Sequence, residues 1–226
     1  ASEAGRQLAA ETAEAVFTAT GDIADARAFT ADVKSRAERA GRAPADIKVM
    51  PGVLVIVGAT RGEAEAKHAL LDSKVHEASA MASLSIALGV DASRFDPDGP
   101  LPEIPETNAS QSARERAVAL ARRENLTVRQ LAQRLGGYGG LTFVGTPHEI
   151  ADTMEEWLAT GASDGFTIMF PYLPGGLFDF VDMVVPELQR RGLLRREYEG
   201  PTLRDNLGLK RPPNRFFPAQ STRRSV

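Results

Sequence analysis

Residues 142–176 read TFVGTPHEIADTMEEWLATGASDGFTIMFPYLPGG, and this stretch decides the fold. Thr146, Pro147 and Glu149 have the residue types and the spacing of a helical capping box with proline in the first turn. Apolar residues then recur every three or four positions as far as Gly161, a residue type that commonly ends helices. The stretch therefore contains one amphipathic helix.

A short apolar run, Phe166–Phe170, follows this helix and contains no charged residue. Such a run is typical of a strand that is buried on both faces in a parallel sheet. The next residues, Pro171–Gly176, are too rich in proline and glycine to continue the strand, so the chain leaves the sheet at the strand's carboxyl end. In α/β folds, that end of the sheet holds the functional site.

Toward the N-terminus, residues 1–75 alternate between expected helices and expected strands. Helices are expected at 3–14, 23–40 and 61–75, and strands at 15–18 and 47–57. Pro51 and Gly52 interrupt the second strand, where we expect a bulge or a bend. Strands that alternate with helices in this way are typical of a parallel sheet with helical crossovers.

Between residues 76 and 140, no stretch has the apolar pattern of a buried strand. Helices are expected at 77–88, 110–124 and 127–135, with a proline-rich loop at 96–105. A loop of this length within a compact domain usually has a function, such as covering a site. We therefore interpret residues 76–140 as a helical insertion that acts as a lid.

After the central stretch, a last helix is expected at 178–191, bent at Pro186, before a charged tail that contains several prolines. The chain then divides into four regions. They are a partial barrel of βα units (1–75), the insertion lid (76–140), the last βα unit (141–192) and an extended C-terminal tail (193–226).

The expected strands are too few for a closed fold. Convincing strands are expected only near Ala15, Ile47 and Phe166, and three parallel strands leave edges and an apolar face uncovered. A complete eight-stranded barrel takes about 250 residues before insertions. The chain also begins at Ala1 without an initiator methionine. We therefore expect an α/β fold that is the C-terminal part of a TIM (β/α)₈ barrel, with a helical insertion between its last two strands and the earlier strands encoded upstream.

The composition excludes several classes of site. With no cysteine among its 226 residues, the chain has no disulfide, thiolate metal ligand or cysteine nucleophile, which fits a cytoplasmic protein. His68 and His76 lie about 80° apart around a helix, which makes them a poor pair for one metal ion. No apolar run is long enough to span a membrane. We expect neither a metal site nor a membrane partner.

Several blocks of sequence, in order along nearly the whole chain, resemble one family of enzymes. They are ASEAGR at 1–6, TNASQS at 107–112, LTVR at 126–129, FVGTP at 143–147, YLPGG at 172–176 and the segment 199–209. This order is similar to that of flavin-dependent monooxygenases of the nitrilotriacetate monooxygenase and dibenzothiophene-sulfone monooxygenase family, within the bacterial-luciferase-like superfamily. Because members of that family are considerably longer, the resemblance implies that the first barrel strands are absent here.

The resemblance also implies a chemistry. In the family, reduced FMN is supplied by a separate flavin reductase and reacts with O₂ to oxygenate a small organic substrate. The protein orients the cofactor and excludes water, a task that fits the insertion lid. The resemblance further implies a homodimer and the missing N-terminal half as a partner, without which this chain is expected to be inactive. It places no catalytic residue in this chain.

Two positions at the start of the chain are candidates for binding the flavin phosphate. The resemblance implies that the loop ending the fifth barrel strand holds this phosphate, which here means Ala1 through its backbone N–H and Ser2 through its backbone and hydroxyl. A helix N-terminus favours an anion by about 0.3–1 kcal/mol. The alternative is that Ser2 only caps its helix. Tyr172, just past the third strand, is a candidate for the flavin or substrate pocket, with packing of its ring as the alternative.

Two other functions are weighed against this one. LTVRQLAQRLG at 126–136, within an arginine-rich segment, is similar to the first helix and turn of a helix-turn-helix DNA-binding module. Such a module needs a recognition helix directly after the turn, whereas the next residues are glycine-rich and then strand-like, and the net charge of −3 opposes phosphate binding. We therefore expect no nucleic-acid partner. The closer alternative is a deazaflavin-dependent oxidoreductase of the same superfamily, whose barrel is similar.

Overall fold

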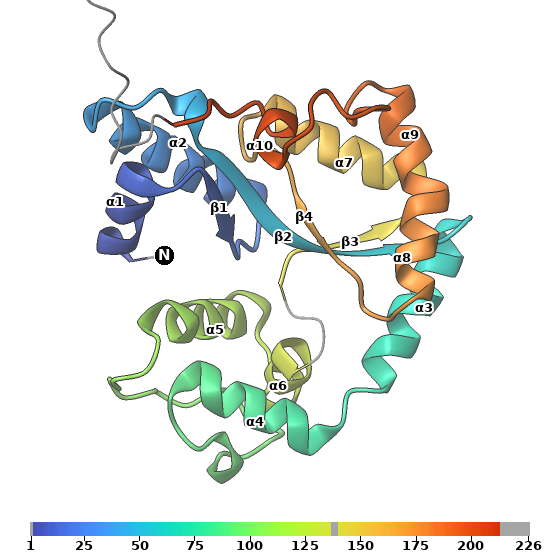
Figure 1. The fold of residues 1–226 in the computed structure, drawn as a ribbon. Helices are drawn as coiled ribbons and strands as arrows, with labels where there is room; N and C mark the ends of the chain where they lie inside the picture. Colours follow the sequence, from blue (N-terminus) through green and yellow to red (C-terminus); the bar gives the residue numbers. More distant parts are fainter. Residues whose placement is uncertain (1, 137–139, 213–226) are drawn as a thin grey trace, which may run out of the picture.

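A computed structural model describes residues 2–136 and 140–212, which form an α/β structure around one long strand (Figure 1). The strands are β1 (Ala15–Thr18), β2 (Lys48–Val57), β3 (Thr142–Gly145) and β4 (Thr167–Met169). The helices are α1 (Glu3–Thr12), α2 (Ile23–Arg39), α3 (Arg61–Ser73), α4 (Glu77–Leu88), α5 (Gln111–Glu124), α6 (Val128–Gly136), α7 (Pro147–Ala159), α8 (Gly175–Asp179), α9 (Val185–Arg190) and α10 (Leu203–Asn206). Among the described residues, none of these helices has the length and apolar character needed to cross a membrane.

The capping box predicted at the start of α7 is confirmed. Thr146 Oγ1 accepts a hydrogen bond from the backbone N–H of Glu149 at 3.3 Å, and Glu149 Oε2 accepts one from the N–H of Thr146 at 2.8 Å. Pro147 occupies the first turn, and Gly161 follows the helix with a φ of +70°. Each of these signals lies within a few residues of the helix end that it specifies, which is why the sequence alone predicts them.

All pairs in the sheet are parallel, and β2 is their common partner. Leu54 pairs with both Thr142 of β3 and Met169 of β4, so β3 and β4 must lie on opposite edges of β2. β1 pairs with Lys48–Pro51 of β2. Just before β4, the carboxylate of Asp164 accepts a hydrogen bond from the N–H of Val49, and the N–H of Asp164 donates one to the C=O of Val49. Because these bonds use the edge of β2 that faces β4, β1 must share the other edge with β3.

The parallel sheet is confirmed, but the expected number of strands is wrong. β3, which comes between the insertion and α7, adds a fourth strand at Thr142–Gly145. It continues the edge of β2 beyond the end of β1, and only at Leu54 does β2 have a strand partner on both edges. The sequence analysis describes these residues as strand-like, but their pairing partner lies about ninety residues earlier in the chain, so the local pattern did not show that they join the sheet.

The bulge expected at Pro51 and Gly52 does not occur, because β2 runs unbroken from Lys48 to Val57. Side chains at 49, 53, 55 and 57 all join the buried clusters on one face, so the alternation of faces is kept through the proline. Pro51 is tolerated because its nitrogen points to the edge where β4 pairs only from Gly52 onward.

One face of the sheet packs against helices and forms the main core. Val53, Val55 and Val57 pack with residues of α2, α7 and α9, all of which lie on the same side in Figure 1. The rings of Phe143, Trp157 and Phe166 meet at centroid distances of 5.9–6.0 Å in edge-on and tilted arrangements. This aromatic cluster fixes α7 against β3 and against the entry to β4.

The other face of the sheet is partly uncovered, which corrects the prediction that the strand at 166–170 is buried on both sides. β4 spans only Thr167–Met169, and the Met169 side chain is 39% exposed. Phe17 of β1 is 61% exposed. An apolar run such as FTIMF shows that a strand is apolar, but the burial of each face depends on which elements cover it.

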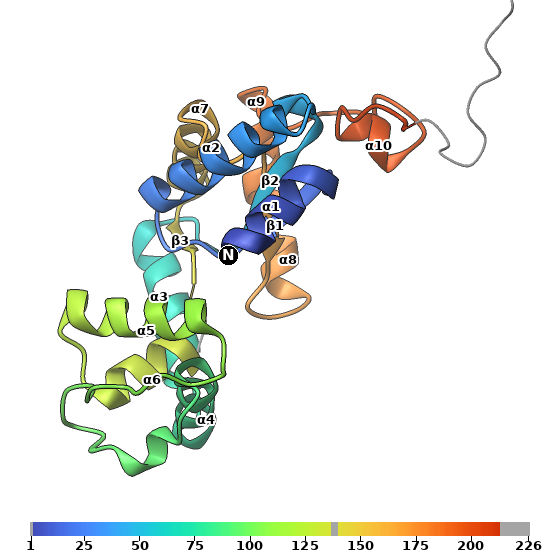
Figure 2. The same cartoon turned by 90° about the vertical axis from the view of Figure 1, so that its left-hand side faces the viewer.

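The insertion forms a bundle of α4, α5 and α6 with a core of its own. Leu84, Leu88, Val128 and Leu131 are fully buried in this second core. Figure 2 shows the bundle set apart from the sheet, in agreement with Figure 1, and α3 leads into it. α6 approaches α4 so closely that a Cβ on Gly136 would lie 2.2 Å from the Cα of Ala80. This close approach requires glycine at position 136.

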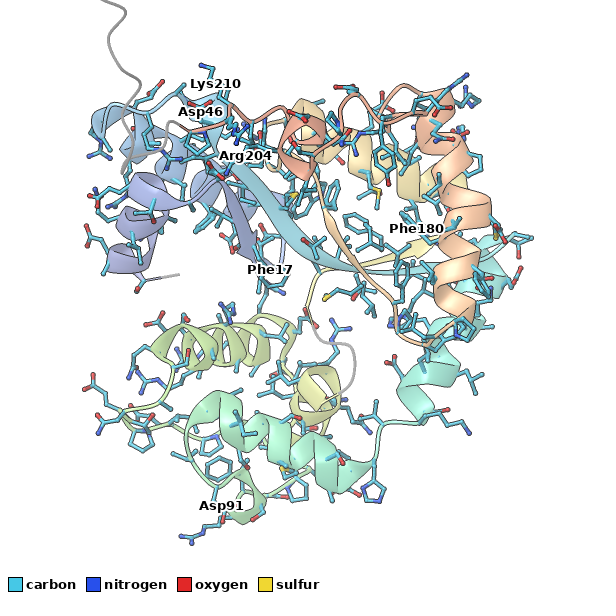
Figure 3. All side chains as sticks on the ribbon, viewed as in Figure 1. Phe17, Asp46, Asp91, Phe180, Arg204 and Lys210 are labelled. Atoms are coloured by element: carbon cyan, nitrogen blue, oxygen red, sulfur yellow. The ribbon has the colours of Figure 1, made fainter. Side chains whose placement is uncertain are left out.

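The last predicted helix begins earlier than expected and contains a wider turn. α8 and α9 are joined by a π-helical turn at Phe180–Val184, directly before Pro186. Proline has no backbone N–H and so cannot donate the hydrogen bond that continues a regular helix. The irregular turn therefore lies next to Pro186, where the sequence predicts a bend. The segment after 193 was expected to be extended but contains α10, where Arg204 pairs with Glu14 at 2.5 Å (Figure 3).

Candidate functional site

A polar network lies at the carboxyl end of β2, between α3 and α8. Asp179 Oδ2 accepts hydrogen bonds from the Tyr172 hydroxyl at 2.9 Å and from Lys67 Nζ at 3.0 Å. Lys67 also donates to the C=O of Val57, the last residue of β2, at 3.0 Å and pairs with Glu63 at 3.0 Å. The network therefore joins the end of β2, α3 and the loop after β4 at the carboxyl side of the sheet.

The contacts in this network shift the protonation equilibria of its members. Burial raises the pKa of the Tyr172 hydroxyl, and the hydrogen bond to Asp179 raises it further. Burial acts to lower the pKa of Lys67, but the hydrogen bonds to Asp179 and Glu63 outweigh it and raise the pKa. The hydrogen bond from Lys67 lowers the pKa of Glu63. At neutral pH the Tyr172 hydroxyl is therefore neutral and Lys67 carries its charge.

Tyr172 is placed by contacts on both its hydroxyl and its ring. The hydroxyl is directed to Asp179, and a Cβ on Gly175 would lie 2.7 Å from the Tyr172 ring. Glycine at position 175 therefore leaves room for the ring to pack on the backbone where α8 begins. These contacts order the loop that follows β4, at the sheet end where α/β folds place their sites.

The partly uncovered sheet face exposes apolar side chains of β1 and β4. The ring of Phe17 covers Gly52, since a Cβ at that position would lie 2.7 Å from it, and the Met169 methyl would lie 3.4 Å away on the other side. In Figure 3, Phe17 points from β1 toward the insertion. Phe17 and Met169 thus form an apolar surface that could accept a planar ring system.

A cleft of about 1040 Å³ opens between the sheet edge and α5. Its lining includes the turn after β1, the end of α3, one face of α5 and the beginning of β3. Its volume is at the upper end of the range for small-molecule sites, about 300–1000 Å³. The cleft adjoins the carboxyl end of β1, so it lies at the same end of the sheet as the Tyr172 network.

Ser2 caps α1, as its position in the sequence predicts. Its Oγ accepts a hydrogen bond from the N–H of Gly5 at 3.2 Å, and the Ser2 side chain is exposed. The N–H groups of Glu3 and Ala4 precede those that Ser2 binds, so they remain available at the helix N-terminus. Ala1, the other residue predicted to hold the phosphate, lies outside the described residues.

The remaining sequence candidates are not brought together. His68 Nε2 lies 3.7 Å from Asp72 Oδ2, and His76 precedes α4 without a side-chain capping bond. In the part of the chain that the structure describes, no group of three histidine, cysteine or acidic side chains could hold a metal ion. The helix-turn-helix alternative is wrong, because α6 packs on α4 and the next described element is the strand β3.

Sequence reasoning missed most of the polar network. Lys67 and Asp179 are 112 residues apart, so nothing local relates them. One signal was present: Thr60 caps α3, which places α3 directly after β2 and brings Lys67 back to the strand end.

Comparison with known protein families gives a direct match. The model of the family described as luciferase-like monooxygenase matches residues 1–164. The chain is 53% identical to nitrilotriacetate monooxygenase component A of Aminobacter aminovorans over 216 residues, which are 94% of this chain and 48% of that protein. The chain therefore spans about half the length of the curated relatives it matches.

Solved structures agree with the sequence match. The crystal structure of DmoA from Hyphomicrobium sulfonivorans superposes with a TM-score of 0.79 and 34% identity, over 92% of this chain and 44% of that one. A structure of the riboflavin lyase RcaE with modified FMN and the substrate riboflavin gives a TM-score of 0.76 and 32% identity, over 92% of this chain and 46% of that one.

Proposed function

Because the chain belongs to the luciferase-like monooxygenase family, we propose that it forms the C-terminal part of an FMN-dependent two-component monooxygenase. The observation that carries this proposal is the exposed apolar surface of Phe17 and Met169, on a parallel sheet that has a cleft at its carboxyl side. A relative 53% identical over 94% of the chain is named as a monooxygenase component. The activity belongs to the longer protein that contains this chain.

The proposed architecture is a TIM barrel in which β1, β2 and β4 are neighbouring strands of the barrel wall. The helical insertion (76–140) then lies between the last two of these strands. Residues 1–75 and 141–192 supply the βα units, and residues 193–226 form the C-terminal tail. Two observations support this division: the insertion has a core separate from that of the sheet, and one sheet face is uncovered. Leu173, Phe178 and Val181 are also exposed, and the N-terminal half of the protein would cover them.

Reduced FMN would supply the electrons that activate O₂, and the residues present fit the cofactor. The α1 N-terminus, with Ser2 and its free N–H groups, would hold the phosphate together with Ala1. The surface of Phe17 and Met169 would lie against the ring system, and the insertion would exclude water from the cleft. The riboflavin lyase structure, which contains a modified FMN, supports this choice of cofactor.

The proposal also gives Tyr172 a structural role and names the partners of the protein. Through Asp179, Tyr172 would keep the loop after β4 in place beside the flavin or substrate pocket. A separate flavin reductase would deliver the reduced FMN, and the protein would act as a homodimer on a small organic substrate. The term "component A" in the name of the nitrilotriacetate relative supports a system of more than one protein.

The proposal is tested with the full-length protein, FMN, a flavin reductase with NADH, and nitrilotriacetate under ¹⁸O₂. We expect the product to carry one ¹⁸O atom and to require both the reductase and FMN. Replacing FMN by a deazaflavin tests the alternative within the superfamily. Equal turnover with the deazaflavin, or oxidation of substrate without ¹⁸O, would show that the protein is not an FMN monooxygenase.

A further inference from the structure

The helix α3 connects the end of β2 to the helical insertion (Figure 1). Val75, which lies shortly after the last residue of α3, packs against the core of the insertion. Between these two ends α3 buries little, since Ala64 is its one buried residue and Leu70 is 59% exposed. The orientation of α3, and of the bundle that it leads into, therefore depends chiefly on the contacts made by its first two turns.

Lys67, in the second turn of α3, makes the central contacts. Its ammonium group donates to the C=O of Val57 at 3.0 Å and to Asp179 Oδ2 at 3.0 Å. It also pairs with Glu63 Oε1 at 3.0 Å. An ammonium group has three N–H donors, so these three oxygens match its full donor capacity. Because Val57 ends β2 and Asp179 ends α8, one side chain joins α3 to both of these elements.

Asp179 is a well-anchored point of attachment. The next residue, Phe180, is 8% exposed, and its ring meets the ring of Phe170 edge-on at a centroid distance of 6.0 Å. Phe180 also begins the π-helical turn, a rare geometry that is frequent at functional sites. The carboxylate oxygen that binds Lys67 also accepts the hydroxyl of Tyr172. Asp179 therefore holds α3 on one side and the loop after β4 on the other.

The pair of Lys67 and Asp179 is better shielded from water than a second ion pair on the same helix. The side chains of Lys67 and Asp179 are 27% and 31% exposed. Those of Arg61 and Glu149, which join α3 to α7 at 3.2 Å, are 57% and 43% exposed. Exposed pairs contribute little to stability, because water and salt screen them. Lys67 is therefore the stronger attachment of α3.

We propose that Lys67 is a positioning residue: by binding Asp179 it fixes α3, and with it the insertion, relative to the loop that carries Tyr172. This inference rests on the proposed function, in which the insertion excludes water from the cleft and Tyr172 lies beside the pocket. Both sides of the site then depend on one carboxylate, which Lys67 and Tyr172 share. Without Lys67, α3 and the loop would fluctuate separately, and water would enter the cleft between the insertion and the sheet.

Hydrogen exchange of the full-length protein without flavin tests the positioning directly. We expect Lys67→Met to speed exchange at least about tenfold in α3 and in residues 172–179, because it removes hydrogen bonds made by a charged group. The buried parts of α4 and α6 should exchange as in the wild type, since the insertion keeps its own core. Lys67→Arg keeps the charge and the donors, so it should restore most of the protection. Lys74→Met, at the exposed end of α3, is the matched control and should leave exchange unchanged.

The fate of O₂ in the complete system gives a second measurement. In a site open to water, reduced FMN passes two electrons and two protons to O₂, which leaves as hydrogen peroxide, and the substrate is not oxygenated. We expect Lys67→Met to raise the yield of hydrogen peroxide per reduced FMN consumed, whereas Lys74→Met should keep the wild-type yield.

Three results would overturn the proposal. They are equal exchange in Lys67→Met and Lys74→Met, faster exchange that extends equally to α4 and α6, and a wild-type peroxide yield in Lys67→Met. The exchange experiment contains no flavin, so it decides the positioning role even if the wild type fails to incorporate ¹⁸O. That failure would count against the proposed function alone.

Discussion

The hydroxyl of Tyr172 donates a hydrogen bond to Asp179 Oδ2 at 2.9 Å, and Lys67 binds the same oxygen at 3.0 Å. We predict that Tyr172→Phe in the full-length protein lowers the free energy of unfolding by about 1–2 kcal/mol, because it removes a hydrogen bond to a charged acceptor. The ring can keep its packing against Gly175, and Asp179 keeps its pair with Lys67. Urea denaturation at neutral pH measures the difference.

Tyr198 supplies the control for this substitution. Its side chain is 82% exposed, so Tyr198→Phe should change stability by less than about 0.5 kcal/mol. If the two variants unfold at the same urea concentration, the hydrogen bond to Asp179 contributes nothing to stability.

Glu187 leads to a prediction about acid stability. Hydrogen bonds from Arg190 and then Arg191 lower the pKa of Glu187 from 4.5 to about 2. Because the folded state binds the proton less tightly than the unfolded state, the stabilisation is complete above pH 4.5 and disappears as the pH falls through about 2. We predict that Glu187→Gln is less stable than wild type at pH 7 and that the difference shrinks between pH 4.5 and 2.

Thermal unfolding at a series of pH values checks this prediction. Glu156 is an exposed carboxylate on α7 with no side-chain ion pair among the described residues, so Glu156→Gln should follow the wild type at every pH. A Glu187→Gln difference that stays constant down to pH 2 would mean that its arginine contacts do not persist in solution.

The sequence predicted the features that neighbouring residues determine. The helix from Pro147 follows from Thr146 and Glu149 alone, and the irregular turn before Pro186 follows from the missing N–H of that proline. The strand-like character of the residues that form β3 was noted, but they were not counted as part of the sheet, because their pairing with β2 spans the insertion. Burial of Met169 was wrongly predicted for a related reason: an apolar residue does not reveal whether another element covers it.

The candidate site was predictable only in its location. A proline- and glycine-rich exit from a buried strand indicates the carboxyl end of the sheet, and Tyr172 lies there. That its hydroxyl binds Asp179, and that Asp179 also binds Lys67, depends on how α3 and α8 pack. The cleft is lined by residues of α2 and α5, which belong to different cores, so it emerges only with the fold.

The aromatic cluster gives a prediction about the main core. Phe143 is 7% exposed and contacts both Trp157 and Phe166 edge-on or nearly so. Phe143→Ala should cost about 3–5 kcal/mol, the range for removing a buried phenylalanine. Ile86 is 78% exposed on α4, so Ile86→Ala should stay within about 0.5 kcal/mol of wild type. Trp157 is the only tryptophan in this chain. In a full-length protein whose other tryptophans are replaced, its fluorescence would report unfolding of the cluster.

Ser2 allows the two roles considered for the α1 N-terminus to be separated. Aspartate is as good an N-cap as serine, so Ser2→Asp should still accept the N–H of Gly5 and keep the free energy of unfolding close to that of the wild type. Its negative charge, however, would repel a phosphate at the same N–H groups. We therefore predict that Ser2→Asp weakens FMN binding at least about tenfold, whereas Ser2→Ala weakens it less and also costs about 0.5–2 kcal/mol of stability. Fluorescence titration of FMN into the full-length protein measures the affinity. Wild-type affinity in Ser2→Asp would leave Ser2 with its capping role alone, since a phosphate held at this helix end cannot be indifferent to a carboxylate placed beside it.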